Sequence, residues 1–193
     1  MSIFRAVPRS SLEAGKDMRR NPGRRLPGNI PYLVDNLWEY TRPRHKPSRR
    51  HAVYASPTPE LALQNAIAGG LRPDEYVACR LDFHVEPAMM QLIVSDARHH
   101  PDVRRLQQLV NRTLGQLAGA GIADKLALAP LFLPGITKDE LAAAMAAEPL
   151  LDRLVRQAAD VVTLWSPAAD AVSPDGELFF EIADDNFYTL QPA

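Results

Sequence analysis

Apolar and polar residues alternate in short segments near both ends of the chain, as is typical of strands with one buried face. The pattern predicts strands over 2–7, 51–56, 75–85, 161–165, 177–182 and 187–190, with a further short strand at 92–95. The segments 177–182 and 187–190 are expected to pair as a hairpin across Asp184-Asp185-Asn186.

The middle of the chain has a different period, with apolar residues recurring every three or four positions as on an amphipathic helix. Helices are predicted over 32–40, from Pro59 onward, over 103–117, over 137–147 and over 150–159. Thr58 can cap the helix that begins at Pro59, and Thr137 with Glu140 has the spacing of a capping box. The apolar, proline-broken stretch 128–134 is expected to be a buried connector.

Strands at both ends with helices between them predict an α+β fold with a mixed or mostly antiparallel sheet. The length of 193 residues favours a single domain, 1–193, in which the helical block at about 98–160 is an insertion or lobe. The chain has neither the glycine-rich fingerprint of a dinucleotide-binding βαβ unit nor a P-loop.

Composition narrows the class of protein. Hydrophobic residues make up 46% and charged residues 23%, the balance of a globular protein. The single cysteine, Cys79, excludes an internal disulfide and a multi-cysteine zinc site, and its alternating flanks favour a half-buried structural thiol. Without an apolar run of 18 residues, no membrane span is expected. The start Met-Ser-Ile-Phe-Arg lacks a secretory signal, so the expected location is the cytoplasm, or a target cell reached without a signal peptide.

Charge is distributed unevenly along the chain. Residues 1–51 hold 12 Lys and Arg against 4 Asp and Glu, a net charge of +8, and residues 52–193 have a net charge of −9. One interpretation is that the oppositely charged portions meet within one domain; the other is that the basic loops 8–31 and 42–50 face a phosphate group. Nucleic acid binding through basic residues 9–50 ranks below both, because few aromatic residues and no DNA-binding motif accompany them.

Three places carry candidate chemistry. Arg5 is a charge in an apolar strand and needs an anionic partner or an edge position. Ser56 and Thr58 end a strand, where a hydroxyl can bind a substrate, although simple helix capping by Thr58 is the alternative. Glu177 and Glu181 are four residues apart on a strand and so face the same side, with surface carboxylates as the alternative. The five histidines form no His-x-x-x-His or His-Glu-x-x-His pair, so no metal site is expected.

Together these places resemble the ADP-ribosyltransferase superfamily, whose pattern is an early strand with Arg, a strand with Ser or Thr, and a late Glu. The resemblance covers 1–7, 49–68 and 175–191. It implies that NAD is the substrate and that Arg5 contacts its phosphate or ribose. Ser56 or Thr58 would support the nicotinamide pocket and the sheet, and Tyr54 would also belong to the NAD-binding residues. Glu177, or Glu181, would stabilise the ribosyl cation that forms as nicotinamide leaves.

The stretch Val53-Tyr-Ala-Ser-Pro-Thr-Pro-Glu-Leu-Ala62, with Phe4-Arg5, also resembles the RES domain, a related NAD-degrading family. RES domains carry a Glu in the following helix, where this chain has Gln64-Asn65, which favours transfer. The sequence therefore predicts an ADP-ribosyltransferase that modifies a macromolecule, most simply a protein, as bacterial or phage effectors and toxins do. The alternatives are an NAD glycohydrolase toxin and a non-catalytic binding module on the same fold.

Overall fold

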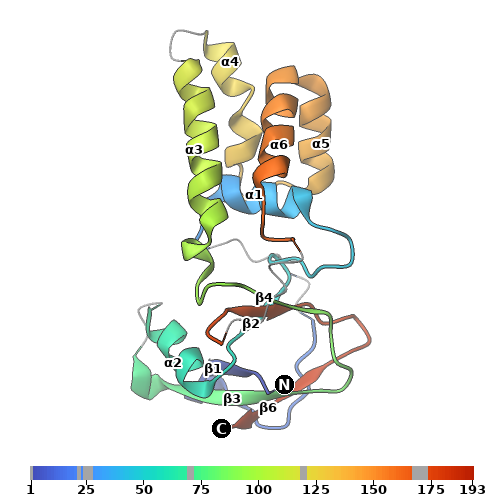
Figure 1. Ribbon diagram of the computed structural model, residues 1–193. Coiled ribbons are helices and arrows are strands. Elements are labelled where there is room, and N and C mark those ends of the chain that lie inside the picture. The colour runs from blue at the N-terminus through green and yellow to red at the C-terminus, as the bar shows by residue number, and fades with distance from the viewer. Residues whose placement is uncertain (1, 21–22, 24–27, 69–71, 118–120, 167–173) are drawn as a thin grey trace. The chain divides into compact units, whose positions relative to one another are not determined.

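Segments from the first and last parts of the chain form two small antiparallel sheets, and a separate set of helices comes from the middle. The computed structural model describes residues 2–193 except 21–22, 24–27, 69–71, 118–120 and 167–173. Over this described part the chain has six α-helices and two sheets of three strands each, both antiparallel (Figure 1). The predicted α+β class is confirmed at this level.

The chain divides into two compact units. The strand-containing unit comprises Met1–Gly23, Arg44–Asp96 and Ala168–Ala193. The helical unit comprises Arg24–Pro43 and Ala97–Pro167, so it includes an early segment as well as the middle of the chain.

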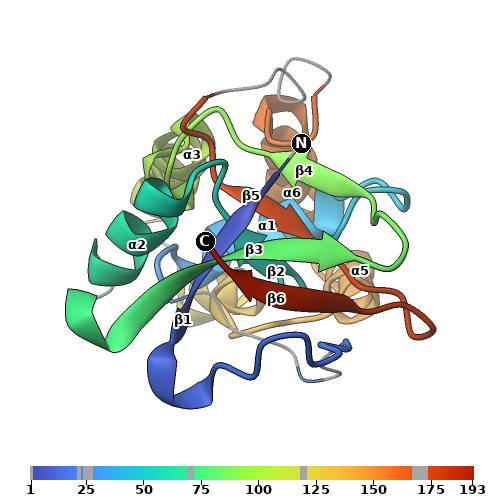
Figure 2. The same cartoon turned by 90° about the horizontal axis from the view of Figure 1, so that it is seen from below.

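The first sheet has the order β1-β3-β6, so β1 (Phe4–Pro8) and β6 (Tyr188–Pro192) are the edge strands on either side of β3 (Tyr76–Phe83) (Figure 2). Helix α2 (Pro59–Ala68) packs against β1 and β3. The helix begins as the sequence predicts, because the Thr58 hydroxyl accepts a hydrogen bond from the Leu61 N–H at 3.2 Å.

The second sheet has the order β2-β5-β4, formed by β2 (Val53–Ala55), β5 (Leu178–Phe180) and β4 (Met89–Gln91). Tyr54, Phe179 and Met90 are direct cross-strand partners across the three strands. The short strand expected at 92–95 therefore lies a few residues earlier in the chain, at β4.

Apolar side chains from both sheets meet in one cluster, which forms the core of the strand-containing unit. The cluster contains Ile3, Val7, Ala55, Cys79, Leu81, Leu178, Phe180, Ile182, Tyr188 and Leu190. Cys79 is fully buried there, more deeply than the sequence suggests, and burial raises the pKa of its thiol. A protonated thiol without access to solvent fits a structural role.

The predicted hairpin between 177–182 and 187–190 is wrong, because β5 and β6 belong to different sheets. Strand β5 pairs with β2 and β4, and β6 pairs with β3. The chain crosses between the sheets at Asn186, whose side chain bonds both the N–H and the carbonyl of Val85 at 3.1 and 2.7 Å. This long-range contact fixes the turn to the end of β3.

In the helical unit, α3, α5 and α6 lie side by side and α1 crosses them (Figure 1). The helices are α1 (Tyr32–Thr41), α3 (Pro101–Gln116), α4 (Ile122–Leu126), α5 (Lys138–Ala147) and α6 (Pro149–Val161). Short 3-10 turns occur at Arg9–Ser11, Pro73–Glu75, Ala97–His99 and Ala129–Phe132. The connector at 128–134 is only partly buried, since Leu128 and Leu131 are enclosed while Phe132 and Leu133 are exposed.

In contrast to the prediction, no strand forms at 161–165, because the buried Asp102 carboxylate binds the backbone N–H groups of this segment. The Asp102 carboxylate accepts the N–H groups of Thr163 and Leu164, both at 2.9 Å from Oδ2. It also accepts the Thr163 hydroxyl at 2.7 Å and the indole N–H of Trp38 at 3.1 Å. The backbone donors that a sheet would use are thus bonded to a side chain. His100 is also buried beside this carboxylate.

Helix α5 begins at the predicted capping box. The Thr137 hydroxyl accepts the Glu140 N–H at 3.1 Å, and Glu140 accepts the Thr137 N–H at 2.8 Å. We expect Thr137→Ala to lower the free energy of unfolding by about 1 kcal/mol, because the Glu140 N–H loses its acceptor and the Glu140 carboxylate loses the Thr137 hydroxyl. Urea denaturation measures this loss, and an unchanged midpoint would contradict a stabilising role for the box. Thr113→Ala is a suitable control, because its hydroxyl bonds only the Leu109 carbonyl inside α3.

No helix in the described part of the chain is both long and apolar enough to cross a membrane.

Candidate functional site

The two candidate carboxylates flank strand β5 and lie on the same face of the second sheet. Leu178 and Phe180 point into the core, so the alternation of the strand places Phe179, Glu177 and Glu181 on the opposite face. Both carboxylates bind the segment that precedes β2: Glu177 bonds Arg49, and Glu181 accepts the Ser48 N–H at 2.6 Å.

Arg49 is the central cation of this face. Its Nη1 donates to Glu177 Oε1 at 2.9 Å, and the side chains are 6% and 11% exposed, so the ion pair is largely shielded from water. The guanidinium also lies over the rings of Tyr54 and Phe179, 5.0 and 5.1 Å from their centroids. Such a cation over two aromatic faces gains electrostatic attraction where water does not compete.

Tyr54 belongs to the surroundings of Arg49 in this structure. Its ring forms one wall of the Arg49 site, and its hydroxyl donates to the Arg49 carbonyl at 2.6 Å. Because Tyr54 and Phe179 are cross-strand partners in the β2–β5 register, the sheet itself sets the spacing of the two rings.

The segment 48–51 forms a tight, buried turn in front of β2. The His51 N–H donates to the Ser48 carbonyl at 3.2 Å, and the Arg50 N–H donates to the Ser48 hydroxyl at 3.2 Å. Among the described residues, the buried His51 Nδ1 has no hydrogen-bond partner. The turn thus encloses one polar atom that the described residues leave without a partner.

Ser56 and Thr58 lie at the junction of β2 and α2. Ser56 exchanges both backbone hydrogen bonds with Phe4, at 2.7 and 2.8 Å, and its hydroxyl accepts from Asn65 Nδ2 at 3.1 Å. The Thr58 hydroxyl caps helix α2, as the capping alternative expects. The Ser56–Asn65 bond joins the end of β2 to α2.

Arg5 lies on the edge strand β1, with neighbours Ile3 and Val7 in the apolar core. Its Nη1 donates to the Tyr188 hydroxyl at 3.3 Å, a long bond to a neutral partner. Across the described residues, no carboxylate pairs with this guanidinium. A half-buried arginine without an anion is a suitable group for binding an anionic ligand.

The three segments with the family pattern meet at one end of the strand-containing unit. Phe4, beside Arg5, bridges Ser56. Ala55 pairs with Leu178, the residue that follows Glu177. The backbone thus places the segments that carry Arg5, Ser56 and Glu177 next to one another. Their side chains bind different partners, Tyr188, Asn65 and Arg49 respectively.

Arg49 lies at the start of the resemblance over 49–68 and in the basic loop 42–50, but sequence reasoning gave it no role of its own and did not identify it as the partner of Glu177. That loop does not present all of its charge to solvent, because Arg49 and Arg50 are both buried. The Arg49–Glu177 and Arg20–Asp184 pairs join the basic first part of the chain to its acidic last part. These pairs support the interpretation that the two oppositely charged portions meet within one unit.

Within the described part of the chain, no group of three or more His, Cys, Asp or Glu side chains forms a metal site. Comparisons with models of known protein families, with curated proteins and with solved structures found no match.

Proposed function

We propose that the strand-containing unit binds NAD and transfers its ADP-ribosyl group to a macromolecular acceptor, most simply a protein. The observation that carries the proposal is that the segments with Arg5, Ser56 and Glu177 adjoin in the backbone, through the Phe4–Ser56 bridge and the Ala55–Leu178 pair. This is the residue combination of the ADP-ribosyltransferase superfamily, assembled from segments more than 50 and 100 residues apart.

In the proposed reaction the bond between ribose C1′ and the nicotinamide nitrogen breaks, and its electron pair leaves with nicotinamide. Positive charge then develops on the ribose, where a fixed carboxylate lowers the energy of the transition state. Glu177 is the residue proposed for this role, and Arg5 is proposed to bind a phosphate of NAD. A nucleophile of the acceptor forms the new bond to C1′ and loses its proton; if water takes this place, the enzyme is an NAD glycohydrolase.

A second candidate is a non-catalytic binding module. It is supported by the Arg49–Glu177 ion pair, which already occupies the proposed catalytic carboxylate in a largely buried position. In that function the ion pair has a structural role and NAD is not turned over.

The experiment that separates these functions follows NAD labelled in its adenine ring, in the presence of bacterial or host cell proteins. Release of nicotinamide with label on a macromolecule supports transfer. Release with the label only on free ADP-ribose identifies a glycohydrolase, and no release by any assay favours the binding module.

The anion-binding role of Arg5 has its own test. We expect Arg5→Ala to raise the KM for NAD about tenfold or more, because a charge-assisted hydrogen bond contributes about 1.5–3 kcal/mol. Arg80→Ala is the matched control. Arg80 belongs to the same sheet as Arg5, where it pairs with Phe4, and its exposed side chain is bonded to Asp82. Equal KM values for wild type and Arg5→Ala would remove Arg5 from the proposed site.

A further inference from the structure

The exposed side of helix α3 has an unusual composition. Its exposed positions recur every three or four residues and so form one stripe along the helix: Pro101, Arg104, Arg105, Gln108, Asn111, Arg112, Gly115 and Gln116. Every long side chain on the stripe is therefore an arginine or an amide. The single acidic residue of the helix, Asp102, is buried and bonded to Trp38, Thr163 and Leu164.

The positive charge of this stripe is not balanced. Arg104 and Arg105 take part in no ion pair with any described residue. By contrast, Arg156 on α6 has the usual compensation of a solvated helix, an i,i+4 pair with Asp152 at 2.9 Å. Arg104 lies near the beginning of α3, where positive charge opposes the helix dipole, and no acidic side chain on the stripe offsets it.

We propose that this stripe of α3 binds double-stranded DNA in the major groove, a function separate from the proposed NAD chemistry. Arginine binds phosphate and guanine edges in a bidentate manner, and Asn and Gln bind adenine edges in the same way. Gln108, Asn111 and Arg112 also line a shallow open hollow of about 390 Å³, so the amides lie in a concave part of the stripe.

The shape of the groove supports this choice of partner. The major groove of B-DNA is about 12 Å wide and admits an α-helix of about 10–12 Å diameter, whereas the corresponding groove of A-form RNA is too narrow. A helix that lies in the groove can direct its arginines to the phosphates and Gln108 and Asn111 to the base edges. An acidic protein would match the positive charge of the stripe, but it would not account for the amide side chains between the arginines.

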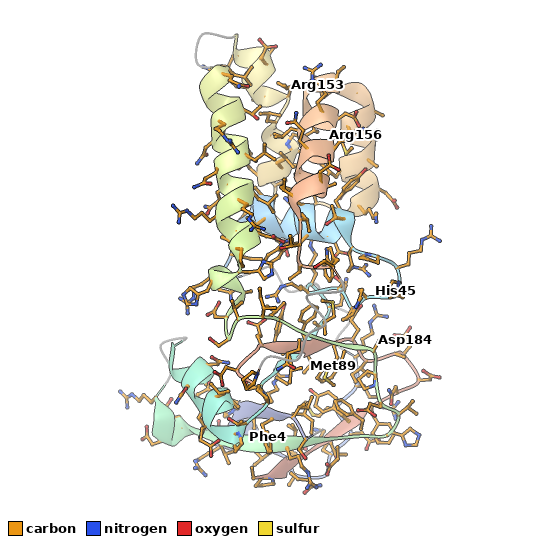
Figure 3. The ribbon with its side chains drawn as sticks, in the orientation of Figure 1. Phe4, His45, Met89, Arg153, Arg156 and Asp184 are labelled. Atoms are coloured by element: carbon orange, nitrogen blue, oxygen red, sulfur yellow. The ribbon has the colours of Figure 1, made fainter. Side chains whose placement is uncertain are left out.

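The test measures the affinity of the full chain for a labelled DNA duplex of about two helical turns at several salt concentrations. We expect Arg104→Gln with Arg105→Gln to weaken binding at least about tenfold at 0.1 M salt and to reduce the salt slope by about 2, since each phosphate contact contributes about 0.9. The matched control is Arg153→Gln with Arg156→Gln, which removes the same charge from exposed positions of α6 in the same unit (Figure 3).

A second pair of variants separates base contacts from charge. Gln108→Ala with Asn111→Ala is expected to weaken binding several-fold without changing the salt slope, because amides neutralise no phosphate. Gln157→Ala, an exposed amide on α6, is its control and should bind as wild type does.

The proposal is overturned if the duplex does not bind, if the α3 and α6 arginine variants lose affinity equally, or if an A-form RNA duplex binds as tightly. Tighter binding to polyglutamate than to the duplex would identify an acidic protein surface as the partner instead and would also overturn it. Because no NAD is present in these measurements, their failure leaves the proposed ADP-ribosyl transfer unaffected.

Discussion

Replacing Glu177 with Gln is expected to lower the rate of nicotinamide release from NAD by about 10²–10³-fold, the usual loss when one electrostatic contact to a developing charge is removed. Gln keeps the size of the side chain and one oxygen that can accept from Arg49 Nη1. The variant nevertheless lacks the negative charge proposed to face the ribosyl cation. The measurement is the rate of nicotinamide release at saturating NAD, so that weaker NAD binding does not account for the loss.

The substitution also affects stability, and this effect has to be measured separately. Glu177 balances the charge of Arg49, whose side chain is 6% exposed. Leaving that guanidinium with a neutral amide costs about 1–3 kcal/mol, because a buried charged donor is then poorly satisfied. A urea unfolding curve of Glu177→Gln shows whether the protein is folded under the assay conditions. Loss of activity in a folded variant supports catalysis by Glu177.

Glu181→Gln is the matched control. It removes the same charge from the other end of β5, where Glu181 accepts the Ser48 N–H. If Glu177 carries the chemistry, Glu181→Gln keeps most of the activity. The opposite pattern would assign the reaction to Glu181, and full activity in both variants would contradict the proposed use of either carboxylate.

Much of the local structure of this chain could be predicted from its sequence. The starts of α2 and α5 follow from short-range chemistry, because the capping hydroxyls of Thr58 and Thr137 bond N–H groups three residues later. Glu177 and Glu181 lie on the same face because side chains alternate along a strand with a period of two residues. In each case the residues that decide the structure are within four positions of one another.

The pairing of strands could not be predicted in the same way. The alternating pattern at 177–182 and 187–190 correctly predicts two strands, but it does not determine which strand each of them pairs with. The deciding contacts are long-range, such as the bonds of Asn186 to Val85, 101 residues away in the chain. A hairpin was the simplest expectation for adjacent strands, and the apolar core between the two sheets favoured the alternative.

The candidate site was predictable in part for the same reason. The pattern of Arg5, Ser56 and Glu177 identified segments that the backbone brings together, but it did not identify Arg49 as the partner of Glu177. The pair joins residues 128 positions apart, and nothing local distinguishes Arg49 from the other arginines of its loop. Only the placement of Tyr54 and Phe179 as cross-strand partners creates the double aromatic face that holds it.

Asp102→Ala is expected to be the most destabilising of the substitutions considered, with a loss of about 3–5 kcal/mol in the free energy of unfolding. The carboxylate is fully buried and accepts the Thr163 N–H and hydroxyl, the Leu164 N–H and the Trp38 indole N–H. Removing it leaves these donors unsatisfied in a site closed to water, at about 1–3 kcal/mol for each donor that finds no new partner. It also releases the segment after α6 from α3.

Two comparisons locate the cause of this loss. Asp160→Ala removes an exposed carboxylate from α6 and is expected to change stability by less than about 0.5 kcal/mol. Asp102→Asn keeps one acceptor oxygen but turns an amide donor toward other donors, so its stability should fall between those of wild type and Asp102→Ala. Urea unfolding followed by tryptophan fluorescence is well suited to the measurement, because Trp38 bonds Asp102 and Trp165 bonds the Trp38 carbonyl. If Asp102→Ala unfolds at the same urea concentration as Asp160→Ala, Asp102 does not hold the helical unit together, and the strand expected at 161–165 must be absent for another reason.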